Sequence, residues 1–591
     1  MMTGAVIDAP AIPVEPPQEA ARPRTVLVIW LILALALPAF APHRYLLSGD
    51  PDKYVLLAGA MSHGEPYEVD GRPETKFSPG FPALLVPAAV LARDDFGVAS
   101  RWAAFLSAFV FPLTYWWAAR RGSRFPLAIA VATVSSTTFL QLATGNPMAD
   151  PAFTAVSLAF LGWADTGKSE PGRESWWNAV LGAVLLTAAV AIRSAGIALI
   201  AAYAVVVAVR AITVRQGARR VIQRALPLLA SIAYLATWSW WANQVHRPLY
   251  PGDAANSYFQ YVTLQDAHQA GLGRVSMVEV FGRLLPGLKT QAAHAGELLT
   301  QIPWIAPVWF SPLLALPLLL VLAGLAQDLR RGRFLGPAYL VGYGVMVALW
   351  PFDEGARFLF PLLPLLFFYV GRGLVRLTNA MRAGDPRVRR GLIVLGSVCL
   401  VGVLIMLLRQ PTAPSRQQLF SVVVWSTLLV LAVFARGLVA ARWSRIVWDR
   451  SAVWVTGLTI AFTVAGIGQI APALAANAKG GGPREITAAA LDRAATWLLS
   501  NSSDSAIVQA TWSSRLHAAT QRRVVPFPTE PEAFTEIDRK FNPRYLVVLD
   551  STVNPYRRPT DPERLTALRA ALGTEPALVH TFAGGSIYAL R

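Results

Sequence analysis

The sequence is poor in charged residues and nearly devoid of cysteine. Asp, Glu, Lys and Arg make up only 15% of the 591 residues, against 54% hydrophobic residues, and the mean hydropathy is +0.43. Soluble proteins carry about 25% charged residues, so this shortage excludes an ordinary soluble enzyme and also a disordered or fibrous chain. With the single cysteine Cys399, the chain cannot form an internal disulfide bond.

Some common sequence signals are also missing. Residues 485–591 contain neither a G-x-G-x-x-G loop nor a P-loop, so we assign no nucleotide site to them. The histidines His43, His63, His246 and His268 show no metal-ligand spacing. No internal repeat is visible along the chain.

What the sequence has instead is a series of long apolar blocks. Nearly charge-free blocks of about the length that crosses a bilayer lie at 26–42, 99–118, 177–192, 195–209, 304–327 and 391–408. These blocks predict a polytopic membrane protein. Counting the weaker blocks as well, we expect about 13 transmembrane helices between residues 25 and 475, which form the membrane domain.

The positive charge is unevenly distributed. The net charge is +18, and the arginines lie in short runs between apolar blocks, around 120–124, 215–224, 330–333, 382–390 and 442–450. Nearly every second connection is basic, which is the pattern of cytoplasmic loops. We therefore expect a multi-pass protein of the plasma (inner) membrane with a cytoplasmic N-terminus. A nucleic-acid partner is not expected, because it would need one contiguous basic face.

This topology divides the chain into regions. Residues 1–24 are predicted to be a disordered cytoplasmic tail, and 43–98 and 244–303 are predicted to be outer loops. The apolar stretch 78–92 is short and interrupted by prolines, so we expect it to lie along the outer interface. After a Gly-rich linker, residues 485–591 alternate strand-like and helix-like segments, which predicts a small extracytoplasmic α/β domain.

Charged side chains at the outer ends of the helices are the candidates for chemistry. They are Asp50, Asp52 and Lys76 in the first outer loop, Asp150 at the start of a helix, and Arg193 and Arg357 in outer turns. Such a set suits sugar transfer from a lipid-linked phosphate: a carboxylate is the general base on an acceptor hydroxyl, and the cations balance the leaving phosphate. Attack opposite the phosphate would invert the anomeric centre.

The same residues resemble the GT-C membrane glycosyltransferases, specifically the family of protein O-mannosyltransferases and the lipid A aminoarabinose transferase (glycosyltransferase family 39-like). Asp50 and Tyr54 match the acidic residue and the Tyr four positions later, and Lys76 through Leu85 resembles the Lys/Tyr-x-Pro-Pro-Leu-like segment. Met148 through Pro151, Arg193 through Gly196 and Arg357 through Pro361 resemble later motifs. The resemblance implies Asp50 and Asp150 as catalytic residues, and Asp52, Tyr54, Lys76, Arg193 and Arg357 as substrate-binding residues.

The first motif departs from the family pattern. Pro51 stands where the family often has a second acidic residue, so both Asp50 and Asp52 are candidates for the base, and the spacing to Tyr54 favours Asp50. The same aspartates could cap a helix. No obligatory cofactor is expected, although a divalent metal bridging Asp50 and phosphate remains an alternative.

The expected partners are a polyprenyl-phosphate-sugar donor, a lipid, glycan or protein acceptor, and membrane lipids. The rival function from another class is a transporter or flippase of a lipid-linked saccharide. A transporter would place ionisable groups near the bilayer midplane and have two related halves, whereas here the charges lie at helix ends. A third alternative is an inactive member whose outer domain only binds cell-wall partners.

Overall fold

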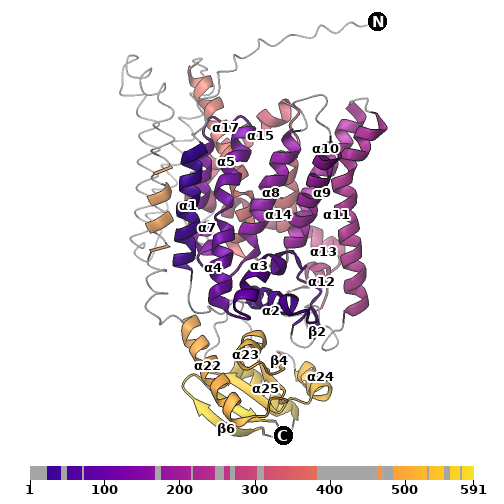
Figure 1. The fold of residues 1–591 in the computed structure, drawn as a ribbon, viewed down its shortest axis with the longest axis vertical. Coiled ribbons are helices and arrows are strands. Elements are labelled where there is room, and N and C mark those ends of the chain that lie inside the picture. The colour runs from indigo at the N-terminus through magenta and orange to yellow at the C-terminus, as the bar shows by residue number, and fades with distance from the viewer. Residues whose placement is uncertain are drawn as a thin grey trace.

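The structure is a computed structural model that describes residues 23–41, 49–69, 72–166, 175–213, 217–246, 258–265, 273–301, 312–382, 483–528, 531–550, 560–572 and 575–590, together with short pieces of 457–471. It is mostly helical, and the helices form a bundle above a small sheet (Figure 1). Cys399 and the helices predicted at 391–408 and 418–436 lie outside these residues, as does most of the one predicted at 451–472.

Several of the described helices are long and apolar enough to cross a membrane. They are α1 (Pro23–Phe40), the span Phe96–Arg120, the span Ser194–Thr213, α11 (Ala218–Val245) and the span Gly355–Leu377. The shorter apolar helices α9 (Trp176–Ile192) and α16 (Leu335–Ala348) pack among them. Within the described ranges, the chain is therefore a helical membrane protein with several apolar helices. The total of about 13 membrane spans remains a prediction.

The ends of the bundle differ in chemistry. We call the end that faces the sheet the site end, and the opposite end the basic end (Figure 1). Helix α8 (Ala149–Thr166) runs from the first to the second, and α9 returns. Helices α5 (Val110–Arg120) and α15 (Pro312–Arg330) both end in arginine at the basic end, where α17 (Leu363–Arg382) also ends.

One predicted helix is broken. The sequence predicts a single helix over 125–143, but the structure has α6 (Pro126–Val134) and α7 (Thr137–Ala143), bent by 60° from each other. Ser136 caps α7, because its hydroxyl accepts a hydrogen bond from the Phe139 amide at 3.1 Å. Serine side chains compete in this way with the helical hydrogen bonds of the backbone, and the helix restarts in a new direction.

Short helices cover the site end. Helix α2 (Gly49–His63) packs on α3 (Gly80–Leu91), and both lie between the bundle and the sheet (Figure 1). With 12 residues, α3 is about 18 Å long, too short for a hydrocarbon core of about 30 Å. The strands β1 (Glu68–Val69) and β2 (Arg72–Pro73) form a small ribbon after α2. Helix α4 (Phe96–Ser107) then leads into α5.

The described part of the region 244–303 contains three further helices. They are α12 (Tyr258–Thr263), α13 (Met277–Gly282) and α14 (Leu284–Thr300). Helix α14 packs against α15, α16 and the 3-10 helix η3 (Gly355–Leu362). It therefore links this region to the turn before α17. Helix α10 (Ile197–Thr213) follows the short 3-10 helix η1 (Ser194–Gly196) at the end of α9.

The C-terminal unit, residues 483–590, contains a mixed five-stranded sheet of order β4-β3-β5-β7-β6. Strands β3 (Val508–Ala510), β4 (Val524–Pro526) and β5 (Tyr545–Leu549) are parallel, and β6 (Ala577–Phe582) and β7 (Gly585–Ala589) form an antiparallel hairpin beside β5. The helices of this unit are α22 (Pro483–Asn501), α23 (Ser513–Thr520), α24 (Pro531–Phe541) and α25 (Asp561–Leu572).

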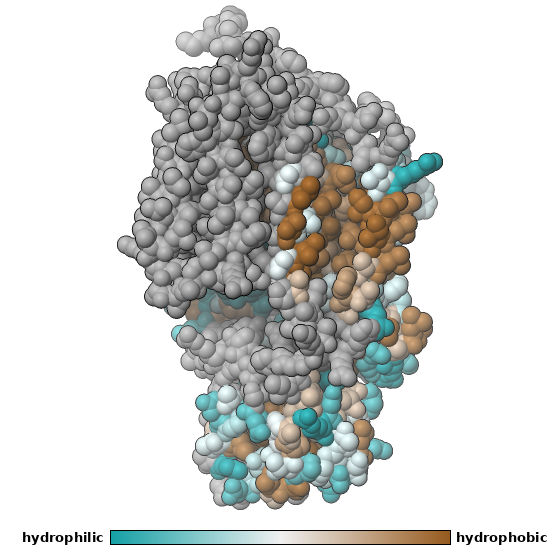
Figure 2. Space-filling model, turned by 90° about the vertical axis from the view of Figure 1, so that its left-hand side faces the viewer, coloured by the Kyte–Doolittle hydropathy of each residue, from teal (hydrophilic) through white to brown (hydrophobic). Residues whose placement is uncertain are grey.

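The C-terminal unit touches the site end of the bundle. Helix α23 packs on α2, and the Arg515 guanidinium lies 5.7 Å from the Phe96 ring centre. The Gln521 amide donates to Asp94 at 3.5 Å. Exposed apolar side chains gather instead on the bundle, as expected for a surface in contact with lipid, and polar residues are frequent on the C-terminal unit (Figure 2).

Candidate active site

Asp150 joins two arginines at the site end. It lies in the first turn of α8, its side chain is only 1% exposed, and it forms an ion pair with Arg193. Arg357 Nε donates to the other oxygen of the same carboxylate at 3.4 Å. A carboxylate buried this deeply needs such partners, because isolated charge is costly away from water. The pairing holds two guanidinium groups side by side.

Local backbone structure fixes both arginines. Arg193 is the extended residue that ends α9 and precedes η1, so its side chain leaves the helix at the site end. Its guanidinium lies 5.6 Å from the Phe358 ring centre. The first residue of α3, Gly80, packs closely against the end of α9. A Cβ atom at Gly80 would lie 2.4 Å from the backbone of Ala191, so only glycine fits there.

Asp50 lies next to the arginine pair and is more accessible. Its side chain is 39% exposed, and its carboxylate is 3.9 Å from Arg357 Nη2. Desolvation raises the pKa of Asp50, but the charges of Lys76, Arg357, Lys53 and Arg193 outweigh it and hold that pKa below its usual range. Asp50 is therefore an ionised carboxylate at neutral pH, surrounded by cations.

The two lysines approach from the first loop. Lys53 Nζ is 3.4 Å from the buried carboxylate of Glu74. The Lys76 ammonium lies 4.4 Å from the centre of the Tyr261 ring and 5.0 Å from that of Phe77. An ammonium over aromatic faces keeps its charge while losing part of its hydration. Lys76 thus contributes positive charge beside Asp50.

Asp52 and Tyr54 are buried. Asp52 is only 2% exposed, although it follows Asp50 by only two residues on the same helix. Tyr54 packs edge-to-face on Phe77 and Phe81, with ring centres 5.0 and 4.9 Å apart. Of the predicted site residues, the structure thus brings Asp50, Asp150, Arg193 and Arg357 together, with Lys76 close by, and packs Asp52 and Tyr54 into the core beneath them.

The turn before α17 carries residues that sequence reasoning missed. Glu354 accepts a hydrogen bond from Arg357 Nη1 at 3.3 Å, a contact that its spacing of three positions could have suggested. Asp353 accepts from the backbone amide of Gly355 at 2.8 Å, and Gly355 has φ +67°, a conformation that favours glycine. These contacts shape the turn that presents Arg357.

A histidine on α14 supports the same turn. His294 is buried, its Nε2 lies 2.9 Å from Asp353, and its Nδ1 lies 3.2 Å from Glu297. Burial disfavours the charged imidazolium, but these hydrogen bonds raise the pKa of His294 to about 9. No motif surrounds this residue, so nothing in the sequence alone could have identified it.

A second ion cluster occupies the basic end. Arg121 pairs with Asp165 at 2.7 Å and with Asp328, and Asp328 also pairs with Arg372. Tyr369 donates to Asp328 at 3.2 Å. Asp328 is fully buried and Arg121 is only 4% exposed. Among its described residues, the most exposed carboxylate is that of Asp165, at 16% against 39% for Asp50, so we treat this cluster as structural.

The site-end arrangement can serve three chemical tasks. Asp50 can accept a proton, and Lys76, Arg193 and Arg357 can balance a polyanion such as phosphate. The ends of apolar helices allow the site to meet a substrate whose chain stays in lipid. Within the described ranges, no group of three or more His, Cys, Asp or Glu side chains could hold a metal ion.

Comparison with solved structures places this architecture in a known class, the GT-C glycosyltransferase fold. The crystal structure of ArnT from Cupriavidus metallidurans bound to undecaprenyl phosphate matches with a TM-score of 0.54 and 15% sequence identity, over 96% of this chain and 98% of that chain. The apo form of the same protein gives a TM-score of 0.48. The archaeal oligosaccharyltransferase AglB from Archaeoglobus fulgidus, in complex with an inhibitory peptide and a dolichol-phosphate, gives 0.47 at 13% identity, over 89% of this chain and 69% of that chain.

Sequence comparison adds nothing to this likeness. No protein-family model matches the sequence. No curated protein matches it either. The shared GT-C fold confirms the resemblance drawn from the site-end motifs at the level of architecture.

Proposed function

We propose that this protein is a membrane glycosyltransferase that moves a sugar from a polyprenyl-phosphate donor to an acceptor hydroxyl. One observation carries the proposal: a partly exposed carboxylate, Asp50, lies beside two arginines that a buried carboxylate, Asp150, holds together. The GT-C fold supports it, and ArnT with that fold binds undecaprenyl phosphate.

In the proposed reaction, the acceptor oxygen attacks the anomeric carbon and gives its proton to Asp50. The bond between that carbon and the phosphate oxygen breaks, and polyprenyl phosphate leaves with the bonding electrons. Lys76, Arg193 and Arg357 stabilise the charge that develops on the phosphate. Because attack occurs opposite the phosphate, the anomeric configuration is inverted.

Asp150 has a separate role in this scheme. Its side chain is only 1% exposed and already engaged by Arg193 and Arg357, so it does not reach a substrate proton. We assign it the positioning of the two guanidinium groups, which acts on the reaction through them. Its burial and the accessibility of Asp50 favour Asp50 over Asp150 as the base, and the burial of Asp52 likewise favours Asp50.

The remaining assignments belong to the same proposal. The site end lies on the outer face of the plasma membrane, the C-terminal unit is extracytoplasmic, and the N-terminus is cytoplasmic. The arginines at the basic end support this orientation, because basic loops stay in the cytoplasm. Acceptors are lipid, glycan or protein hydroxyls, and no cofactor is obligatory, so a chelator is expected to leave the rate unchanged.

Asp50→Asn tests the base. We expect the purified variant to keep its melting temperature and its binding of undecaprenyl phosphate, and to lose sugar transfer by roughly 100- to 10,000-fold, the usual contribution of a general base. The assay follows release of undecaprenyl phosphate from a panel of undecaprenyl-phosphate hexoses and pentoses, with acceptors extracted from the envelope.

Asp504→Asn is the matched control, because Asp504 is a fully exposed aspartate on the C-terminal unit. It should transfer sugar like the unaltered protein. Undiminished turnover by Asp50→Asn would refute the assignment of the base. Movement of the labelled donor across a vesicle membrane without any covalent transfer would instead identify a transporter.

A further inference from the structure

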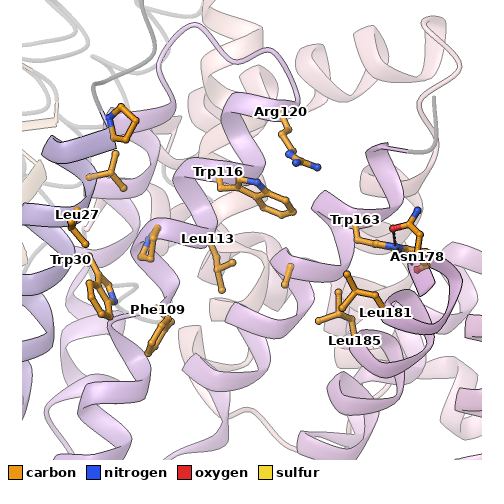
Figure 3. A pocket seen from close by; sticks show the side chains of 14 residues that line it. Leu27, Trp30, Phe109, Leu113, Trp116, Arg120, Trp163, Asn178, Leu181 and Leu185 are labelled. Atoms are coloured by element: carbon orange, nitrogen blue, oxygen red, sulfur yellow. Dashed lines mark hydrogen bonds between the residues drawn. The ribbon is translucent and has the colours of Figure 1, made fainter. Parts of the chain in front are cut away.

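A groove of about 850 Å³ lies toward the basic end, between α1, α5, α8 and α9 (Figure 3). Its walls are mostly apolar, with Trp30, Phe109 and Leu113 among the lining residues. Ala159 and Trp163 on α8 give its position, since they follow Asp150 by nine and thirteen residues. At 1.5 Å per residue, the groove is roughly 13 to 20 Å from the candidate active site along this helix.

The groove opens onto the lipid-facing surface. Only 11% of the helix α1 span is buried, and two of the lining side chains, Leu27 and Leu181, are 53% and 50% exposed. Helices of this length and composition lie in the hydrocarbon core, where the surrounding molecules are lipids. The occupant of the groove must therefore carry an apolar chain that is already dissolved in the bilayer.

The rim at the basic end is polar and positive. Arg120 lies there, exposed, with its guanidinium 4.4 Å from the Trp116 ring centre, which holds the charge at the mouth of the groove (Figure 3). On the opposite wall, the Asn178 side-chain oxygen accepts from Trp163 Nε1 at 2.9 Å, so its amide NH₂ is turned away from the tryptophan. Among the residues that the structure describes, no acidic side chain lines the groove. The rim therefore complements a negatively charged headgroup.

We propose that the groove is a binding site for an anionic glycerophospholipid of the leaflet at the basic end. An acyl chain lies along Leu113 and Trp30, and the phosphate contacts Arg120. A polyprenyl phosphate has similar chemistry, but its phosphate is required at the other end of the bundle, beside Arg193 and Arg357. This site is therefore additional to the proposed donor site, and the choice of a glycerophospholipid over a polyprenyl phosphate rests on the proposed function.

Native mass spectrometry of the full-length protein tests this site. The protein is released from detergent after equilibration with a phosphatidylglycerol or with a phosphatidylcholine that has identical acyl chains. We expect one phosphatidylglycerol to be retained in preference, and Arg120→Ala to reduce that preference roughly tenfold, as expected for loss of a hydrogen bond to a charged group. Ala159→Leu, which narrows the apolar part, should lower retention of both lipids.

Arg330→Ala is the matched control, because Arg330 is an exposed arginine at the same end of the bundle that does not line the groove. Equal retention of the two lipids by the unaltered protein would overturn the proposal. An equal effect of Arg330→Ala would also overturn it, because a diffuse attraction to basic loops would then explain the preference. Displacement of the retained lipid by undecaprenyl phosphate would identify the groove as a prenyl site instead. The melting temperature of each variant reports whether it is folded.

Discussion

The two ends of helix α8 carry ion clusters built from the same residue types but with different accessibility. Asp150 begins the helix and Asp165 lies near its other end, about 22 Å away at 1.5 Å per residue. At the basic end, Asp328 is completely buried between Arg121 and Arg372. At the site end, Asp150 is equally buried between two arginines, but Asp50 stands beside them with 39% of its side chain exposed.

This difference shows how a structural ion cluster is distinguished from a candidate active site. In the basic-end cluster, the guanidinium of Arg372 also donates to the backbone carbonyl of Arg121 at 2.8 Å, and Arg333 donates to the same carbonyl at 3.2 Å. The donors are thus directed at the protein itself. At the site end, the cations also face an accessible carboxylate, and Arg193 and Arg357 are themselves 16% and 24% exposed. Burial of the ion pairs alone would not separate the two clusters.

The largest expected effect comes from breaking the basic-end cluster. Asp328→Asn removes the carboxylate that Arg121 and Arg372 share, so the buried guanidinium of Arg372 loses this ion pair while Arg121 keeps its pair with Asp165. Removing one partner of a buried pair costs about 3–5 kcal/mol, so we expect poor accumulation of folded protein and a large fall in melting temperature. Thermal unfolding in detergent, followed by fluorescence, measures it. A melting temperature equal to that of the unaltered protein would show that the cluster does not hold the bundle together.

Replacing the corresponding carboxylate at the site end, that of Asp150, should mainly lower the rate of sugar transfer. Asp150→Asn leaves Arg193 and Arg357 able to turn toward solvent, since their side chains are 16% and 24% exposed. We expect undecaprenyl phosphate to bind within a few-fold of its normal affinity, but transfer to fall by about 100-fold, because misplaced groups lose that much in rate. Asp150→Asn and Asp328→Asn are each other's controls. Equal losses of stability in both would remove the distinction between the two ends.

The smallest expected effect is a pH dependence confined to the site end. The pKa of His294 rises from 6.5 to about 9 in the folded protein. Its contacts therefore stabilise fully below pH 6.5, and the contribution disappears as the pH rises through about 9. We expect His294→Gln to cost about 1–2 kcal/mol at pH 6, since Asp353 is partly exposed, and little at pH 10. Melting curves of the unaltered protein and of His294→Gln between pH 6 and pH 10 measure this effect. A difference in melting temperature that stays the same at every pH would contradict the ion pairing of His294.

Much of this contrast was visible in the sequence, because charges in a membrane protein are sparse and carry information by position. The order of Asp50, Asp150, Arg193 and Arg357 predicted a cluster at the ends of distant helices, and the structure brings these four together. The arginine runs predicted a basic end. What the pattern could not give is burial: Asp52 lies two residues from Asp50 yet is packed into the core.

Other features depend on contacts that no local pattern encodes. The break at Ser135 and Ser136 results from a capping hydrogen bond inside an apolar stretch that reads as one helix. Strand β4 has only three residues, too few to show the alternation of apolar and polar side chains that identifies a strand in a sequence. His294 supports the turn before α17 through Asp353, 59 positions away in the chain. Each of these is decided by tertiary packing, which overrides the propensity of the segment.

The contact between α23 and α2 has a consequence for biogenesis. Phe96 and its stacking partner Arg515 are separated by about 420 residues, so at a typical elongation rate of about 5–20 residues per second they are synthesised roughly 20 to 80 s apart. In the last part of that interval, once α17 has been made, the helices around Asp50 are complete while the C-terminal unit that packs on α2 has not been made. The ribosome therefore completes this end of the molecule last, and a nascent chain held in the translocon presents it uncovered to whatever assembly factors or lipids are nearby.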